Sequence, residues 1–271
     1  MFEHIKLRKN KSIGLHHFYT MKILLTSVLS LITATLFAWG PTGHRVVGEV
    51  ATDHLSKKAN KKITEVLEGE SLAMCSNWMD FIKSDDSYDS LKSWHYVTIP
   101  ELEKYHHEGE MKGDVIQAID RFIYEIRSGE YSVDEKFAIR CLVHLVGDIH
   151  QPLHVGNGED RGGNNVKVKW FGRSSNIHRV WDSEIIDNQK LSYTEYATWI
   201  NVTEKDQVAK WQADATMKWV EESISYRESI YNIPENGKLG YDYNYDHIEE
   251  VNMRLLQAGV RLAGILNELY G

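Results

Sequence analysis

Cysteine is scarce in this sequence, and its scarcity excludes one class of metal site. The chain of 271 residues contains two cysteines, Cys75 and Cys141. Structural zinc sites are commonly rich in cysteine, with four protein ligands, so two cysteines cannot form a zinc ribbon. The sequence does not decide whether the two are paired. Cys141 lies in an apolar stretch, which favours a buried thiol.

Long apolar runs are absent after residue 38, so no later stretch could cross a bilayer. Residues 23–37 form a shorter apolar run that follows Lys22 and has the length of a signal-peptide core. We therefore expect translation to start at Met21 and cleavage to follow Ala38. Residues 1–38 would be an N-terminal extension with a signal peptide. Residues 39–271 would be the functional domain, exported to the periplasm or the medium, without stable membrane association.

Basic residues are outnumbered in this chain. Lysine and arginine total 31 against 39 acidic residues, which gives a formal charge of −8 at pH 7. The first 38 residues hold five basic residues and one acidic residue, so residues 39–271 carry −12. This balance argues against a basic groove as the main means of binding nucleic acid. Histidine, by contrast, is frequent, with 13 residues in the whole chain.

Residues 141–155 read CLVHLVGDIHQPLHV and combine an apolar helix with candidate metal ligands. His144 and Asp148 are four residues apart, so they lie on one face of a helix. Pro152 ends the helix, and His154 follows it. A histidine and a carboxylate that face a core are either a satisfied pair or metal ligands. This helix alone leaves both interpretations open.

A second pair with the same spacing, His178 and Asp182, lies next to apolar residues further along the chain. Three other candidates look ordinary when taken singly: His44, Asp80 and His95. With a possible terminal amine they bring the number of candidate donors to nine. Imidazole and carboxylate ligands suit zinc, at three or four ligands per ion. The full set therefore favours a centre of two or three zinc ions.

Hydrophobic periodicity predicts a mostly α fold, a single helical domain with a small β-hairpin. The predicted helices cover residues 45–55, 57–70, 72–82, 113–127, 135–149, 176–182, 193–200, 204–224 and 248–269. Alternation over residues 166–171, followed by Gly172, predicts a hairpin strand. We expect an extended segment at 94–100, an acidic loop at 84–90 and a turn-rich loop at 156–165. The tyrosine-rich stretch 237–246 has no clear assignment.

Six motifs occur in a fixed order: WGPTGH, NWMDFIK, WHYV, LVHLVGDIHQPLHV, GGNNVKVKWFG and NIHRVWD. In order and spacing they resemble the tri-zinc, single-strand-specific nucleases of the S1/P1 family, and the resemblance covers residues 39–271. It implies a phospholipase C and P1 nuclease-like helical fold with three zinc ions per chain. It also implies hydrolysis of single-stranded DNA and RNA to 5′-phosphate products, and 3′-nucleotidase activity on 3′-nucleotides.

The resemblance also assigns ligands to each zinc ion. The first ion would be held by the amine and carbonyl of Trp39 with His44 and Asp148. The second would be held by Asp80, His95 and His144, with Asp148 bridging the two ions. The third would be held by His154, His178 and Asp182.

Substrate contacts follow from the same resemblance. Lys83 matches a basic residue that binds or polarises the phosphate, and Asn164 matches a substrate-contacting asparagine. Tyr96 keeps an aromatic ring on which a base can stack. Asp80 is our candidate for orienting the attacking water, so Asp80 and Lys83 are the candidate catalytic residues. Thr98 replaces an aspartate that reads the base edge in some members, which leaves base preference open.

Two other functions compete with this interpretation. A zinc-dependent phospholipase C shares the fold and the metal chemistry but acts on phospholipid head groups, and Tyr96 and the GGN hairpin favour the nuclease. A zinc-storing or structural protein would be expected to use cysteine. Because three zinc ions would add six positive charges to a strongly acidic chain, we expect metals, more than lysines, to attract phosphate. Binding should then depend only weakly on salt.

Overall fold

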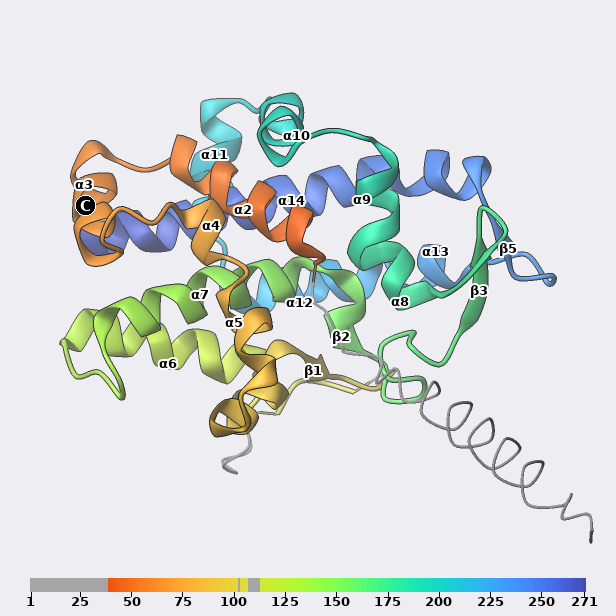
Figure 1. The fold of residues 1–271 in the computed structure, drawn as a ribbon, viewed down its shortest axis with the longest axis horizontal. Coiled ribbons are helices and arrows are strands. Elements are labelled where there is room, and N and C mark those ends of the chain that lie inside the picture. Colours follow the sequence, from red (N-terminus) through yellow and green to blue (C-terminus); the bar gives the residue numbers. More distant parts are fainter. Residues whose placement is uncertain (1–38, 102, 107–112) are drawn as a thin grey trace, which may run out of the picture. The chain divides into compact units, whose positions relative to one another are not determined.

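The computed structural model describes residues 39–101, 103–106 and 113–271 (Figure 1). They belong to one compact unit, residues 37–271. The expected leader, residues 1–38, lies outside the described residues. The fold is mostly helical, as the sequence predicts, and it contains two small sheets. None of the described helices is both long enough and apolar enough to span a membrane.

The α-helices are α2 (Pro41–Asp53), α3 (Lys57–Val66), α4 (Leu72–Cys75), α5 (Trp78–Phe81), α6 (Val115–Ser128), α7 (Glu135–His150), α8 (Ile177–Arg179), α9 (Ile185–Asn188), α10 (Tyr193–Ile200), α11 (Lys205–Gln212), α12 (Thr216–Ser225), α13 (Arg227–Tyr231) and α14 (Tyr241–Tyr270). Short 3-10 or π segments are η1 (Ile82–Ser84), η2 (Asp86–His95), η3 (Pro152–His154) and η4 (Val180–Glu184). The strands are β1 (Val97–Thr98), β2 (Val155–Gly156), β3 (Lys167–Trp170), β4 (Arg173–Asn176) and β5 (Lys238–Leu239).

Helix α7 forms the centre of the core. Nearly every residue from Phe137 to His150 is buried, as expected of a helix that is apolar on all sides. It begins at an N-cap, where the Asp134 carboxylate accepts from the Phe137 amide at 2.7 Å. Helices α6, α12 and α14 pack around it, while α2 packs against α14, α10 and α4 (Figure 1). Helix α7 also contacts α2 and α5.

Two small sheets complete the fold. Strands β1 and β2 pair in parallel, with Val97 opposite Val155, which brings the segment after His95 next to the exit of α7. Strands β3 and β4 form an antiparallel hairpin, and β5 adds to β3 in parallel. The hairpin prediction is confirmed. Its two-residue turn, Phe171–Gly172, has positive φ at both positions, as type I′ turns require.

The predicted helix 72–82 is instead two short helices, α4 and α5, followed by η1. The break lies at Ser76, whose carbonyl accepts a hydrogen bond from His144 Nδ1 at 2.6 Å. The predicted acidic loop and the start of the extended segment form the 3-10 helix η2, which Asp85 caps through the Ser87 amide at 3.0 Å. Only Val97–Thr98 is a strand.

Two other stretches of the chain could be assigned correctly only from the tertiary structure. The predicted helix 204–224 is divided into α11 and α12, and between them Asp214 accepts from Arg261 at 2.6 Å. The unassigned stretch 237–246 forms β5 and the first turn of α14. There, buried Tyr243 donates to the Ile230 carbonyl at 2.8 Å and accepts from Trp181 Nε1 at 2.9 Å.

Both cysteines are free and buried. The predicted buried thiol at Cys141 is confirmed. Burial raises the pKa of the Cys75 thiol to about 12, so this side chain is a neutral thiol at neutral pH. Neither cysteine belongs to the clusters of histidine and aspartate described next.

Candidate metal centre

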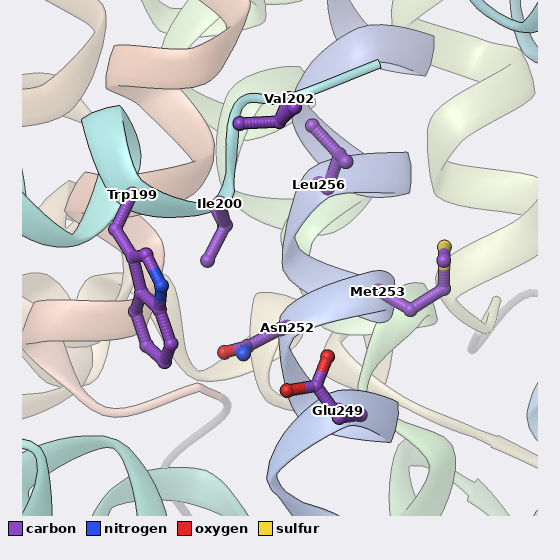
Figure 2. A pocket seen from close by; sticks show the side chains of 7 residues that line it. All are labelled: Trp199, Ile200, Val202, Glu249, Asn252, Met253 and Leu256. Atoms are coloured by element: carbon purple, nitrogen blue, oxygen red, sulfur yellow. The ribbon is translucent and has the colours of Figure 1, made fainter.

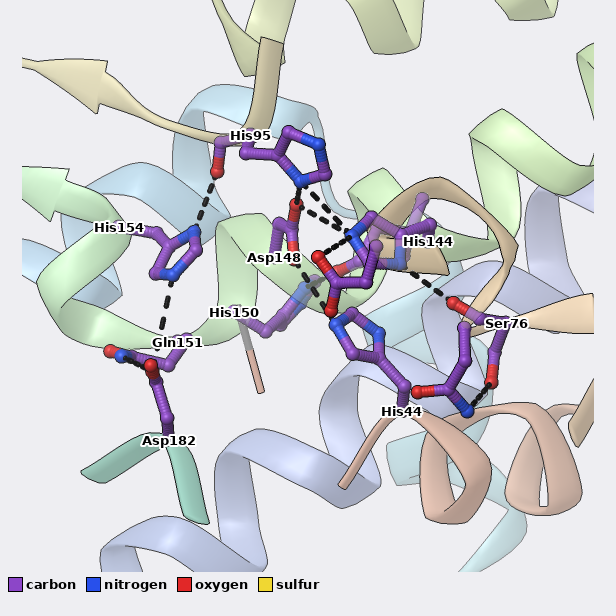
Figure 3. Close-up of polar contacts among 12 residues, drawn as sticks. His44, Ser76, His95, His144, Asp148, His150, Gln151, His154 and Asp182 are labelled. Carbon is purple, nitrogen blue, oxygen red and sulfur yellow. Dashed lines mark hydrogen bonds and ion pairs between the residues drawn. The ribbon is translucent and has the colours of Figure 1, made fainter. Parts of the chain in front are cut away.

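The eight histidine and aspartate side chains predicted as ligands gather in one region of the structure. Figure 3 labels six of them: His44, His95, His144, Asp148, His154 and Asp182. Helices α2, α5, α7 and α8 and the segments η2, η3 and η4 supply them. All are buried except Asp80, which is partly buried. They form three groups, each with its donor atoms within 4.8 Å of one another: His44, Asp80 and His144; His95, His144 and Asp148; His154, His178 and Asp182.

Asp148 lies at the centre of the first two groups. Its Oδ1 is 3.3 Å from His44 Nε2, and its Oδ2 is 2.9 Å from His95 Nδ1. The same Oδ2 is 3.3 Å from His144 Nε2. The two carboxylate oxygens thus face different imidazoles, as a carboxylate shared between two ions would.

The first two groups are joined through His144, and this arrangement differs in detail from the ligand sets that the resemblance implies. His144 Nε2 lies 3.0 Å from His95 Nδ1 and 3.7 Å from Asp80 Oδ1. Asp80 is therefore grouped with His44 as well as with His144. The third group matches the implied set residue for residue.

In the third group, Asp182 is the shared carboxylate. Its Oδ2 is 3.1 Å from His178 Nε2, and its Oδ1 is 3.9 Å from His154 Nε2. The rings of His154 and His178 stack with centroids 5.2 Å apart. Gln151 donates its side-chain amide to Asp182 Oδ1, and its own Oε1 accepts from the Leu153 amide at 2.5 Å. Gln151 therefore connects the end of α7 to the third group.

Backbone carbonyls orient three of the histidines. His144, His154 and His178 each use Nδ1 to donate to a carbonyl at 2.6 Å, belonging to Ser76, His95 and Gly162 respectively. A carbonyl can only accept, so Nδ1 carries the proton, and in the neutral imidazole Nε2 then keeps a lone pair. In all three residues Nε2 approaches an aspartate of the cluster. This arrangement is typical of metal-binding histidines.

Several buried polar atoms of the cluster have no hydrogen-bond partner among the described residues: both ring nitrogens of His44, Oδ2 of Asp80, Oδ1 of Asp148 and Nε2 of His154. Leaving such an atom unsatisfied costs about 1–3 kcal/mol, and a bound cation removes that cost. Ligands of a tetrahedral zinc ion lie about 3.3 Å apart, close to the 2.9–3.3 Å separations around Asp148. The donor set and its spacing fit divalent metal ions.

The protonation states also suit a metal. Burial lowers the pKa of His95 to about 4, and burial likewise lowers the pKa of His44 and of His154. Burial would raise the pKa of Asp148, but the neighbouring His144 outweighs it and holds this pKa well below its usual range. For His144, Asp148 and Asp80 outweigh burial and raise the pKa. Near pH 7, His95 is a neutral imidazole and Asp148 a carboxylate, which are the metal-binding forms.

The candidate substrate residues lie around this cluster. Lys83 Nζ is 2.5 Å from Asp80 Oδ1. Tyr96 follows His95 and its side chain is 42% exposed. Asn164 lies in the loop whose Gly162 carbonyl holds His178, and its side-chain amide donates to the Arg161 carbonyl at 3.0 Å.

Trp39 lies against the same region. Its side chain is fully buried, and the amide of the next residue, Gly40, donates to the Asp182 carbonyl at 2.7 Å. A Cβ on Gly147 would lie 3.8 Å from Trp39 Cδ1 and 2.8 Å from His44 Nδ1. The start of the described chain is thus packed between the first and third ligand groups.

Residues that orient ligands were missed by the sequence analysis. Gln151 fixes Asp182, the Ser76 carbonyl fixes His144, and Gly147 makes room for the His44 ring. Ligand spacing carries no information about such residues. One signal was present, because an isolated glycine inside an otherwise apolar helix indicates close packing.

A pocket between α10 and α14 lies elsewhere (Figure 2). Its lining residues are Trp199, Ile200, Val202, Glu249, Asn252, Met253 and Leu256. None of the predicted ligands or substrate residues contributes to it. Its buried polar residue, Asn252, already accepts a hydrogen bond from Tyr196 Oη at 2.6 Å. The candidate functional site is therefore the histidine and aspartate cluster, not this pocket.

Comparison with known proteins places this cluster in context. Endonuclease 2 of Arabidopsis thaliana is 30% identical over 294 residues, which span 95% of this chain and 98% of the plant protein. Nuclease P1 of Penicillium citrinum is 25% identical over 269 residues, spanning 86% of this chain and 98% of the fungal protein. Nuclease S1 of Aspergillus oryzae is 27% identical over 183 residues, which span 64% of this chain and 63% of the fungal protein.

The family described as S1/P1 Nuclease matches residues 39–271. That range includes all three ligand groups. Homologues named as endonucleases and nucleases are hydrolases that act on ester bonds. This chain accordingly belongs to the S1/P1 nuclease family.

Proposed function

We propose that this protein is a zinc-dependent nuclease with three zinc ions per chain. It hydrolyses single-stranded DNA and RNA to 5′-phosphate products and has 3′-nucleotidase activity. The observation that carries the proposal is the buried, cysteine-free cluster in which Asp148 contacts three imidazoles. Single-strand preference and 3′-nucleotidase activity rest on the motif resemblance together with membership of the family.

The ligand sets that we propose follow the resemblance. Trp39, His44 and Asp148 would hold the first ion, and Asp80, His95 and His144 would hold the second, with Asp148 shared. His154, His178 and Asp182 would hold the third. Support comes from the three groups of donor atoms and from their unpaired buried nitrogens and oxygens.

Bound zinc ions would supply a water whose pKa falls from ~15.7 towards ~7 and would neutralise phosphate oxygens. Burial would raise the pKa of Asp80, but His144 and Lys83 outweigh it and lower that pKa, so Asp80 is ionised at neutral pH. Within the described part of the chain its Oδ2 has no hydrogen-bond partner, so it can accept a hydrogen bond from the attacking water and orient it. Lys83 Nζ, beside Asp80, would donate to a phosphate oxygen.

Substrate recognition would use three exposed or partly exposed residues. The Tyr96 ring, 42% exposed next to His95, would stack a base close to the scissile phosphate. Asn164 would contact the substrate from the loop that also holds His178. Thr98 is exposed on β1 but has no carboxylate, so we expect weak discrimination among bases.

We also propose that residues 39–271 form the mature, exported enzyme and that residues 1–38 are removed. Two facts support this: residues 23–37 resemble a signal-peptide core, and the family match begins at residue 39. Fractionation of the native host, followed by N-terminal sequencing of the protein, would test it. Full-length protein retained in the cytoplasm would contradict it.

The decisive experiment combines metal analysis with a substrate panel. Protein that begins at Trp39 should contain about three zinc ions per chain and cleave single-stranded DNA and RNA much faster than duplex DNA. Phosphatidylcholine should not be hydrolysed. Faster turnover of phosphatidylcholine would favour a phospholipase C, and zinc content without any phosphodiester turnover would favour a structural or storage protein.

A further inference from the structure

The small sheet beside the third ligand group is positively charged, whereas the chain as a whole is acidic. Strands β3, β4 and β5 contain ten residues, of which four are basic and none is acidic. The whole chain has a formal charge of −8. The sheet is therefore a positively charged element of an acidic chain.

The register places three of these lysines on one face. Lys169 pairs with Lys238 on β5 and with Ser174 on β4, and Lys167 pairs with Asn176. Directly opposed residues point to the same side of a sheet. Lys167, Lys169 and Lys238 are exposed, whereas alternate residues of the same strands are buried. We call these three lysines the basic face.

The basic face is not neutralised by the protein. Within the described part of the chain, none of its three lysines has a carboxylate within ion-pair distance. Like charges directly opposite one another destabilise a sheet, and Lys169 faces Lys238 in this way. A face that keeps such charges is suited to an anionic ligand.

One end of the basic face is continuous with the candidate metal centre. Lys167 Nζ donates to the carbonyl of Asn164 at 2.9 Å. On the neighbouring strand, β4 leads directly into Ile177 and His178. In Figure 1 the sheet extends away from α8, which carries this histidine. A ligand on the basic face could therefore continue into the metal centre.

The other end of the sheet carries an aromatic side chain. Phe171, in the hairpin turn, packs edge-on against Tyr241 with ring centroids 4.8 Å apart. Tyr241 is 80% exposed. Single-strand binding surfaces combine positive charge along the backbone with aromatic rings on which bases stack. The sheet and the start of α14 offer both.

We propose that the basic face binds the phosphates of single-stranded nucleic acid beyond the scissile bond, and that Tyr241 stacks a base at its far end. Alternate residues on a strand are ~6.6 Å apart, which suits consecutive phosphates of an extended strand. This proposal rests on the proposed nuclease function and extends it. Metals suffice for short substrates, whereas long strands gain additional contacts.

The test compares a double variant, Lys169→Gln with Lys238→Gln, with a charge-matched control, Lys57→Gln with Lys62→Gln. The control residues are exposed on α3, on the opposite side of Figure 1 from β3. The substrates are a thymidine dinucleotide and a single-stranded thymidine 12-mer, assayed over a salt series. Two lost phosphate contacts should reduce the salt slope for the 12-mer by about 1.4. We expect kcat/KM for the 12-mer to fall about tenfold at low salt, with the dinucleotide and the control unaffected.

Binding of a fluorescent 12-mer whose linkages resist hydrolysis, measured on the zinc-loaded proteins, separates this proposal from the nuclease function. If the wild-type protein cleaves neither substrate, the nuclease function fails, while weaker binding by the lysine double variant still supports the basic face. Tyr241→Ala should weaken binding of the 12-mer but not of an abasic 12-mer, and Tyr124→Ala on α6 serves as its control. Unchanged 12-mer binding in the lysine double variant overturns the proposal. If inorganic polyphosphate binds as tightly as the 12-mer, the basic face is not specific for nucleic acid, and that part of the proposal is overturned.

Discussion

At the scale of single residues, Asp148 and His154 occupy unequal positions in the cluster. Asp148 contacts His44 through one oxygen and His95 and His144 through the other. His154 Nε2 approaches the third group through Asp182, while its Nδ1 donates to the backbone carbonyl of His95, which is not a proposed ligand atom. Loss of Asp148 should therefore disturb two metal positions, and loss of His154 only one.

We expect Asp148→Ala to lose two zinc ions per chain and all detectable activity, because two positions lose the carboxylate that they share. His154→Ala should lose one zinc ion. Metal content per chain, measured by mass spectrometry of the purified proteins, provides the readout. Asp206→Ala, an exposed change on α11, controls for effects of purification. Equal metal loss in the two cluster variants would show that Asp148 is not shared.

His150 provides a prediction about pH. It is fully buried, donates from Nδ1 to the Val146 carbonyl at 2.8 Å, and accepts from Arg261 at 3.0 Å. Burial, with Arg254 and Arg261, holds the pKa of His150 well below 6.5. The unfolded chain binds this proton below about pH 6.5 and the folded chain does not. The free energy of unfolding should therefore fall with decreasing pH, with His150 contributing about 1.4 kcal/mol per pH unit.

In His150→Gln the contribution of His150 to the pH dependence of the free energy of unfolding is absent. A glutamine can still donate to Val146 and accept from Arg261. Urea unfolding of both metal-free proteins at pH 7, 6 and 5 measures the difference in slope. Other buried histidines contribute to both proteins alike and cancel in the comparison. Parallel pH dependences for the two proteins would rule out His150 as the titrating group.

At the scale of elements, α7 combines two requirements in one helix. Apolar residues on all sides make it the core, while His144 and Asp148 contribute to two ligand groups. Between them, Gly147 faces the His44 ring, and a Cβ there would lie 2.8 Å from His44 Nδ1. This glycine allows α2 to approach α7 closely enough to bring His44 to Asp148.

Gly147→Ala tests this close approach. Helix propensity alone predicts a gain of about 1 kcal/mol for glycine to alanine inside a helix. The contact with the His44 ring should reverse the sign, lower the free energy of unfolding, and reduce zinc content. The cost should shrink in a His44→Ala background, because the ring is then absent. Stabilisation of the otherwise wild-type protein by Gly147→Ala would contradict the packing argument.

At the scale of the whole molecule, the start of the described chain packs against the candidate metal centre. Trp39 is fully buried, and the Gly40 amide binds the Asp182 carbonyl at 2.7 Å. The buried Trp39 side chain thus places residue 39 between helices that are remote from it in sequence. If its amine is a ligand, the centre can be completed only after residues 1–38 are removed.

One additional alanine before Trp39 should therefore abolish activity and lower the zinc content by one ion, because a peptide nitrogen cannot replace an amine as a ligand. The helical circular dichroism spectrum should not change. Protein released from a cleavable fusion, so that it begins at Trp39, is the matched control. Full activity in the extended protein would exclude the amine as a ligand.

The sequence predicted much of this architecture, and the exceptions have identifiable causes. The pattern of α6 and α7 is local, so both helices end within two residues of the prediction. The break at Ser76 depends on His144, which is 68 residues away. The division between α11 and α12 coincides with Asp214, which binds Arg261, 47 residues away. A window of neighbouring residues contains no signal for such contacts.

The sequence by itself determined the helical class, the identity of the candidate ligands and the resemblance to the nuclease family. These depend on residue type and spacing, which one-dimensional patterns record. Only the tertiary structure decided that Asp148 lies among three imidazoles, that backbone carbonyls set the histidine tautomers, and that Gln151 holds Asp182. The reason is that each of these interactions joins segments that meet only when the core packs around α7.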